Sequence, residues 1–208
     1  MGLNLKYMID NLDIVKTLLN FNNPGDFYFL IILKRKKDQP EGERDNHQSV
    51  RTIKTYCVDS LEYLDKRYDE IKQLCEMFKA RAYIHVQKQN HRDVSLNMMV
   101  ALAQRIQDGN HKQQGLFDSV VGQIKTHEKR WIVDVDTLDA AELIGVMLAI
   151  NICKPTDEDK IITSIPTKNG FHLITKRFDV MQFSKQYPNI DIQKKNPTLL
   201  FLPDSLED

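Results

Sequence analysis

The centre of the expected fold is the stretch from Arg130 to Asp136, whose sequence is RWIVDVD. Its apolar residues predict a buried strand, and this strand ends in two carboxylates separated by one residue. Because side chains alternate between the two faces of a strand, Asp134 and Asp136 should project from the same face. We therefore expect two like charges side by side at one end of a core strand.

The sequence that follows this stretch predicts alternating helices and strands. The predicted elements are a helix over 136–152, strands over 160–166 and 170–176, a short helix over 179–187, a strand over 189–193 and an added strand over 198–203. The order β-α-β-β-α-β is that of the split β-α-β unit of ferredoxin-like and RNA-recognition-motif (RRM) folds. We expect an α+β protein with an RRM-like unit in residues 129–208.

Residues 1–128 predict an α/β half that precedes this unit. The predicted elements are an amphipathic helix within 1–21, strands over 27–37, 51–58 and 81–87, helices over 60–79 and 93–106, and a modest helix over 116–126. A polar loop is predicted over 38–49, where proline and glycine interrupt the pattern. A length of 208 residues favours one compact domain built from both halves.

Charge and composition narrow the class of protein. The chain has 29 Lys and Arg residues and 29 Asp and Glu residues, so it has no overall positive field for nucleic acid. The basic run Lys34–Lys37 could contact a nucleic-acid backbone locally, but such runs are also typical of a solvated strand end.

No apolar run reaches the roughly 20 residues of a membrane span. Three widely spaced cysteines form neither a zinc knuckle nor a disulfide framework. These features predict a cytoplasmic protein without a membrane span.

The pair Asp134 and Asp136 has a chemical and a structural interpretation. Two carboxylates at this spacing repel each other unless a cation lies between them, and oxygen ligands of this kind suit Mg²⁺ or Mn²⁺. In the structural interpretation, Asp136 caps the following helix while Asp134 lies at a solvated strand end. The pattern by itself leaves both interpretations open.

Two further patterns favour the chemical interpretation. The sequence TKNGFH over 167–172 predicts a turn that places His172 beside it, where an imidazole can donate a hydrogen bond to phosphate. An ordinary hairpin with a half-buried histidine is the alternative. Asp191 lies inside an apolar β-like segment, and burying an unpaired carboxylate costs several kcal/mol, so an edge position or a shared cation is favoured. In a split β-α-β unit these strands lie in the same sheet.

Together these patterns resemble the three signature motifs of the archaeo-eukaryotic primase and primase-polymerase superfamily. The matching segments are hydrophobic-Asp-hydrophobic-Asp at 133–136, a small-residue turn ending in histidine at 169–172, and hydrophobic-Asp at 190–191. The resemblance covers about residues 129–203. It departs from the family at Gly170, where the family often has serine, and in lacking a zinc knuckle or a following helicase domain.

The resemblance implies a nucleotidyltransferase of DNA replication, of a phage or mobile-element type, that joins nucleotides on a nucleic-acid template with two metal ions. The implied catalytic metal ligands, for Mg²⁺ or Mn²⁺, are Asp134, Asp136 and Asp191. The implied nucleotide-binding residues are His172, Lys168, Gly170 and Lys176. The implied partners are nucleoside triphosphates, a DNA or RNA template and a replicative helicase.

Two other functions remain open on the sequence alone. One is a non-catalytic RRM-like module that binds nucleic acid, although its predicted strands offer few outward-facing aromatic residues for base stacking. The other is a metal-dependent phosphodiesterase or nuclease, in which water rather than a sugar hydroxyl attacks the phosphorus atom.

Overall fold

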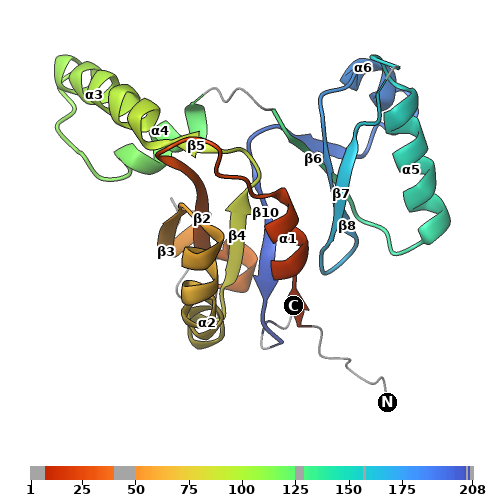
Figure 1. Ribbon diagram of the computed structural model, residues 1–208, viewed down its shortest axis with the longest axis horizontal. Helices are drawn as coiled ribbons and strands as arrows, with labels where there is room; N and C mark the ends of the chain where they lie inside the picture. The colour runs from red at the N-terminus through yellow and green to blue at the C-terminus, as the bar shows by residue number, and fades with distance from the viewer. Residues whose placement is uncertain (1–7, 40–49, 125–128, 157, 205, 207–208) are drawn as a thin grey trace.

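The structure, a computed structural model, describes residues 8–39, 50–124, 129–156, 158–204 and 206. These residues form two antiparallel sheets with helices around them, which confirms the predicted α+β class (Figure 1). The strands are β1 (Ile9–Asp10), β2 (Asp26–Arg35), β3 (Val50–Val58), β4 (Arg81–His85), β5 (Gln89–Asn90), β6 (Trp131–Val135), β7 (Ile161–Pro166), β8 (Phe171–Thr175), β9 (Asp191–Gln193) and β10 (Pro197–Leu202). The helices are α1 (Leu12–Leu18), the 3-10 helix η1 (Lys36–Asp38), α2 (Leu61–Phe78), α3 (His91–Gln107), α4 (Leu116–Gln123), α5 (Ala140–Ile152) and α6 (Val180–Ser184).

The first sheet is built around β2. Within the described residues its strand order is β1-β10-β4-β2-β3, and β5 pairs with the beginning of β2. The apolar run of β2 is buried on both faces: Tyr28, Leu30 and Ile32 pack in the core that includes α2, while Phe27 and Phe29 pack with α3 and α4. A strand covered on both sides needs a continuous apolar sequence rather than an alternating one, as residues 27–33 have.

Helix α2 covers one face of this sheet and lies within one residue of its predicted bounds at each end. The Ser60 hydroxyl oxygen accepts a hydrogen bond from the backbone N–H of Tyr63 at 3.1 Å, which satisfies one exposed donor at the helix start. Lys79, in the left-handed conformation, ends the helix. The polar loop predicted over 38–49 falls mostly on residues 40–49, which lie outside the described residues.

The amino-terminal region differs from the expected helix over 1–21. Residues 1–7 lie outside the described residues, β1 occupies residues 9–10, and α1 covers only 12–18. Ile9 and Asp10 instead pair with Leu202 and Phe201 of β10. The apolar spacing of this region therefore reflects an edge strand followed by a short helix.

The second sheet has the strand order β7-β8-β6-β9, with β6 between β8 and β9. All of its paired strands are antiparallel. Helices α5 and α6 cover one face, where Trp131, Val133 and Val135 pack (Figure 1). The other face turns toward the first sheet, because Ile132 and Ile174 belong to the same core as Tyr28 and α2. The two sheets therefore share a core.

Strand β10 differs from the sequence prediction in its place. It was expected beside the carboxy-terminal unit, but it lies between β1 and β4 in the first sheet. Its apolar pattern identifies a strand but carries no information about which neighbour it pairs with. The buried Asn11 amide fixes this arrangement, since it donates to the Pro166 carbonyl of β7 at 2.9 Å and to the Leu199 carbonyl of β10 at 3.0 Å.

No helix in the described part of the chain is both long enough and apolar enough to cross a bilayer.

Candidate functional site

Asp134 lies in the middle of the second sheet and faces the first sheet. Its register partners are His172 on β8 and Asp191 on β9, one on each side. Directly opposed residues of antiparallel strands project from the same face, with Cβ atoms about 5 Å apart. The structure therefore brings together one residue from each of the three motifs found in the sequence.

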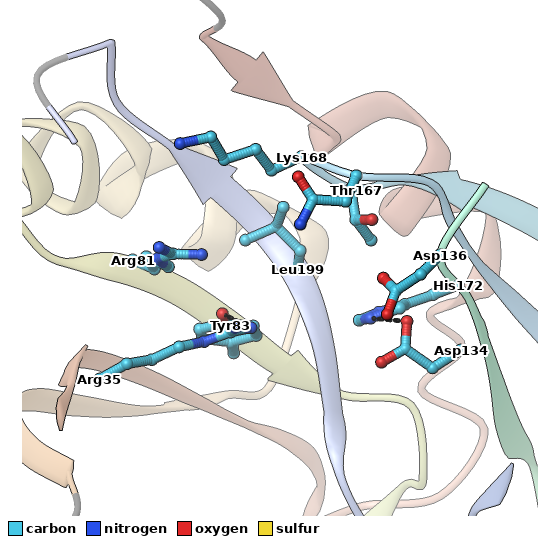
Figure 2. A pocket seen from close by; sticks show the side chains of 10 residues that line it. Arg35, Arg81, Tyr83, Asp134, Asp136, Thr167, Lys168, His172 and Leu199 are labelled. Atoms are coloured by element: carbon cyan, nitrogen blue, oxygen red, sulfur yellow. Dashed lines mark hydrogen bonds and ion pairs between the residues drawn. The ribbon is translucent and has the colours of Figure 1, made fainter. Parts of the chain in front are cut away.

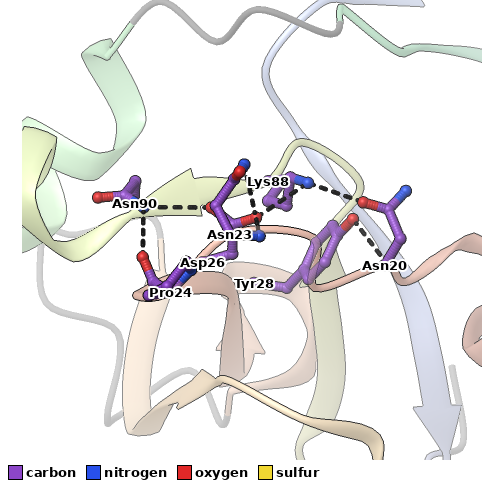
Figure 3. Close-up of polar contacts among 7 residues, drawn as sticks. All are labelled: Asn20, Asn23, Pro24, Asp26, Tyr28, Lys88 and Asn90. Carbon is purple, nitrogen blue, oxygen red and sulfur yellow. Dashed lines mark hydrogen bonds and ion pairs between the residues drawn. The ribbon is translucent and has the colours of Figure 1, made fainter.

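Asp136 follows β6 by one residue and is exposed. It lines a cavity together with Asp134 and His172, and Figure 2 shows both carboxylates beside the imidazole. Asp136 does not cap the following helix, because α5 begins at Ala140 and its cap is Asp139, whose Oδ1 accepts from the backbone N–H of Ala141 at 2.9 Å. The structural interpretation of Asp136 as a helix cap is thus wrong.

The side-chain amide of Gln193 links Asp191 to Asp134. Gln193 Nε2 donates to Asp191 Oδ2 at 2.9 Å and lies 3.5 Å from Asp134 Oδ2. The amide is a neutral donor between two carboxylates that would otherwise face each other. Within the described residues, no group of three or more His, Cys, Asp or Glu side chains already encloses a metal position. A cation shared by Asp134 and Asp191 would have to displace the Gln193 amide.

The charged groups around Asp134 include two carboxylates and one guanidinium, so its surroundings are negative on balance. Burial raises the pKa of this carboxyl, the charges of Asp136 and Asp191 raise it further, and the charge of Arg35 opposes them. Like charges that crowd a partly buried carboxylate are relieved by a bound cation. Carboxylate oxygens are also the donors that Mg²⁺ and Mn²⁺ prefer, so the donor chemistry is compatible with either ion.

His172 is buried, with 6% of its surface exposed, and both of its ring nitrogens have polar neighbours. Nδ1 lies 2.9 Å from the Thr198 hydroxyl of β10, and Nε2 lies 3.5 Å from Asp134 Oδ1. Burial, together with the charge of Arg35, lowers the pKa of His172 to about 4, so the ring is neutral at pH 7. With the proton on Nε2, Thr198 donates to Nδ1 and His172 points its N–H at Asp134. The imidazole therefore connects the two sheets at the carboxylate.

The turn before His172 provides the rim of the cavity. Lys168 and Asn169 line it, and the backbone N–H of Thr167 closes the turn on the Gly170 carbonyl at 2.8 Å. Gly170 itself faces the chain after β6, where an added Cβ would lie 1.9 Å from the Val135 carbonyl oxygen. Only glycine fits there, so this position shapes the turn and has no room for the serine hydroxyl that the resembling family often has.

Lys176 is not brought to the site. It follows the far end of β8, where Thr175 pairs with Trp131 at the start of β6. Its ammonium group forms an exposed ion pair with Glu158 at 2.8 Å. Four residues of extended strand separate it from His172, a distance on the order of 13 Å.

The first sheet supplies residues that the motifs did not identify. Arg35, Arg81 and Tyr83 line the same cavity as Asp134 and His172, as Figure 2 shows. A second cavity of about 410 Å³ shares Arg35, Tyr83, Asp134 and His172 and continues between the sheets toward Leu33, Val50, Gln193, Asn196 and Pro197. The basic run Lys34–Lys37, which begins at the end of β2, was the only sequence signal for this wall, and nothing in the run itself showed that Arg35 lines the same cavity as the carboxylates.

No protein-family model, curated protein or solved structure matches this chain. Any assignment of function therefore depends on the geometry and chemistry of the site.

Proposed function

We propose that this protein is a metal-dependent nucleotidyltransferase of the primase-polymerase type, acting on nucleoside triphosphates and a DNA or RNA template. The observation that carries the proposal is the register of the second sheet, in which Asp134 is flanked by His172 and Asp191 at the mouth of a cavity. Residues from three segments that are distant in the sequence thereby meet on one face.

The proposed RRM-like character of residues 131–193 has support from topology. These residues run β-α-β-β-α-β, the sheet order is β7-β8-β6-β9, and both helices lie on the same face. This order supports the proposal of a split β-α-β unit, in which the first and third strands are central. A catalytic site on the face opposite to the helices is consistent with it.

In the proposed mechanism, Asp134, Asp136 and Asp191 hold Mg²⁺ or Mn²⁺. The bound ions would activate the attacking 3′-hydroxyl and stabilise the leaving pyrophosphate. His172 would border the Asp134 carboxylate, with Nε2 at 3.5 Å from Oδ1, and Lys168 would offer positive charge to the phosphates from the rim. Asp134 is partly buried, which strengthens its interaction with a bound cation relative to the exposed Asp136 and Asp191.

A non-catalytic RRM-like binding module is less consistent with the packing. Such modules stack bases on the sheet face opposite to the helices. Here Ile132, Ile165 and Ile174 of that face are fully buried in the core shared with the first sheet. The end of the face that carries Asp134 opens into a cavity, and the second sheet contributes Asp134 and Asp136 to its wall.

The proposal is tested by incubating the full chain with Mn²⁺, labelled nucleoside triphosphates and a primed or unprimed template. We expect products longer than the primer, or new short oligonucleotides, and loss of at least about 100-fold in rate for Asp134→Asn. Glu142→Gln is the matched control, because it removes one exposed carboxylate from the first turn of α5, away from the cavity. Its rate should equal that of the unchanged protein.

Two results of the same assay would contradict the proposal. Shortening of the template or primer, lost in Asp134→Asn, would identify a metal-dependent nuclease that uses the same carboxylates. Tight binding of template without any change in its length, in a protein that also binds nucleotide, would identify a non-catalytic module.

A further inference from the structure

Arg35 is a cation held in a fixed position beside the proposed metal site. It is the last residue of β2, and its guanidinium donates a hydrogen bond to the Tyr83 hydroxyl of β4. The guanidinium carbon also lies 5.3 Å from the centre of the Tyr83 ring, within the range of a cation–π contact. Tyr83 is 5% exposed, so the group that holds Arg35 is itself fixed by packing.

The neighbouring Arg81 differs from Arg35 in its partners. Arg81 donates to both carboxylate oxygens of Asp38, at 2.7 and 3.0 Å, in an ion pair whose side chains are 5% and 3% exposed. Its charge is therefore balanced inside the first sheet. Among the described residues, Arg35 forms no ion pair with a carboxylate. Within the described part of the chain, the charge of Arg35 is therefore not paired inside the first sheet.

The carboxylates on the facing wall have the complementary imbalance. Asp134 and Asp136 line the same cavity as Arg35, and like charges crowd around Asp134. No direct ion pair joins Arg35 to Asp134 within the described residues, and the shared cavities lie between the two walls. A ligand that presents a cation to the carboxylates and an anion to Arg35 would satisfy both walls at once.

We propose that Arg35, held by Tyr83, binds the phosphate chain of a metal-coordinated nucleoside polyphosphate from the sheet opposite to the carboxylates. A planar guanidinium offers two parallel donors to phosphate oxygens, which an ammonium group cannot do. Asp134 and Asp136 would hold the divalent cation, which would neutralise their charge and coordinate the phosphates. The nucleoside part of this ligand rests on the proposed function, whereas the polyphosphate part follows from the two walls of the cavity.

The direct test is calorimetric titration of the full chain with inorganic triphosphate in the presence of Mn²⁺, and with Mn²⁺ alone. Arg35→Ala should weaken triphosphate binding about tenfold or more, since a charge-assisted contact is lost. Arg35→Lys should recover part of the affinity, and Tyr83→Phe should lose less than Arg35→Ala because it keeps the ring. Binding of Mn²⁺ alone should be unchanged or tighter in Arg35→Ala, because a repelling charge is removed from beside the carboxylates.

Lys34→Ala is the matched control. It removes one positive charge from the adjacent position of β2, whose side chain lies on the other face of the strand and does not line either cavity. Triphosphate affinity of this variant should stay within about twofold of the unchanged protein, as expected for a distant surface charge. An equal loss in Lys34→Ala and Arg35→Ala would show a diffuse charge effect and overturn the inference.

Other outcomes also contradict the inference. The inference fails if the unchanged protein does not bind triphosphate in the presence of Mn²⁺, or if folded Arg35→Ala binds triphosphate as tightly as the unchanged protein does. It also fails if Arg35→Ala weakens the binding of Mn²⁺ alone as much as it weakens the binding of triphosphate. Should Arg35→Ala not fold, Arg35→Lys and Tyr83→Phe decide by the same comparison. Primer extension that persists in Arg35→Ala with an unchanged KM for nucleotide would leave the proposed function standing without this contact. Triphosphate binding that depends on Arg35, in a protein that transfers no nucleotide, would support the Arg35 contact and contradict the proposed function.

Discussion

Among single side chains, His172 changes its role most between sequence and structure. The sequence left two interpretations open, an imidazole that meets phosphate and a half-buried histidine of an ordinary hairpin, and in the structure the ring is buried between Thr198 and Asp134. Each ring nitrogen has one polar neighbour, Thr198 at 2.9 Å from Nδ1 and Asp134 at 3.5 Å from Nε2, and these neighbours orient the ring. The histidine therefore lies against the carboxylate, and the proposed phosphate contacts are assigned to groups on the cavity rim and on the first sheet.

Thr198→Val tests the hydrogen bond to His172. The substitution keeps the shape of the side chain but leaves a buried imidazole nitrogen without its partner, which should cost about 1–3 kcal/mol in the free energy of unfolding. Urea denaturation measures this cost. Thr175→Val is the control, because its hydroxyl is also buried but has no hydrogen-bond partner within the described structure. That variant should be neutral or more stable, and a similar loss in both variants would argue against the bond.

Asp134→Asn should increase stability while it removes activity. The substitution abolishes repulsion from Asp136 and Asp191 that, together with burial, raises the pKa of the carboxyl. We expect about 1 kcal/mol of added stability at pH 7 in the absence of divalent ions, as is typical when a strained functional group is replaced. In addition, Mn²⁺ should raise the unfolding temperature of the unchanged protein and have little effect on the variant. A variant that is less stable without metal would contradict this description.

At the level of elements, the contact between the β7–β8 turn and the end of β6 determines the shape of the site. Gly170 is buried against the backbone of residues 135–137, so the turn that bears Lys168 lies close to the segment that bears Asp136. The glycine is required by this close approach of two backbones rather than by an unusual backbone angle.

Gly170→Ala and Gly170→Ser should both be strongly destabilising. A Cβ placed 1.9 Å from the Val135 carbonyl oxygen forces the turn and β6 apart, at an expected cost of about 2 kcal/mol or more. Thermal unfolding measures the loss, and nucleotide transfer should fall with it. Gly122→Ala in α4 is the control, since nothing lies within 4 Å of the added atom. It should gain up to about 1 kcal/mol from better helix propensity. A fully stable Gly170→Ser protein would show that the turn can move.

In the whole molecule, the site exists because two sheets are held face to face. The Gln87 amide donates to the carbonyls of Arg130 and Lys194, at 3.0 and 2.6 Å, and the Arg130 guanidinium donates to the Leu18 carbonyl at 2.6 Å. The shared apolar core lies beside these contacts. Loss of the interface would separate Arg35 from Asp134 even if each sheet stayed folded.

Stability should depend on pH through two histidines, the buried His172 and the partly buried His85. Burial lowers the pKa of both His85 and His172 to about 4, compared with about 6.5 in the unfolded chain. Between these values the unfolded state binds more protons, so the free energy of unfolding should rise with pH from about 4 to 6.5 and level off above. The change should approach about 3 kcal/mol for each histidine at most, and Asp134, with a raised pKa, works in the opposite direction. Urea denaturation across this range measures the change. His172→Gln should flatten the curve, and a free energy of unfolding that falls with pH would contradict the lowered pKa of the two rings.

The sequence by itself determined the α+β class, the position of most strands and helices, and the identity of the acidic residues on β6 and β9. These follow from local patterns, because periodicity, caps and turn residues act over a few positions. The tertiary structure decided the rest. Which sheet β10 joins, the burial of His172, the displacement of Lys176 from the site and the approach of Arg35 all depend on contacts between segments distant in sequence. Pairing partners and burial are properties of the packed chain, and no short stretch of sequence contains them.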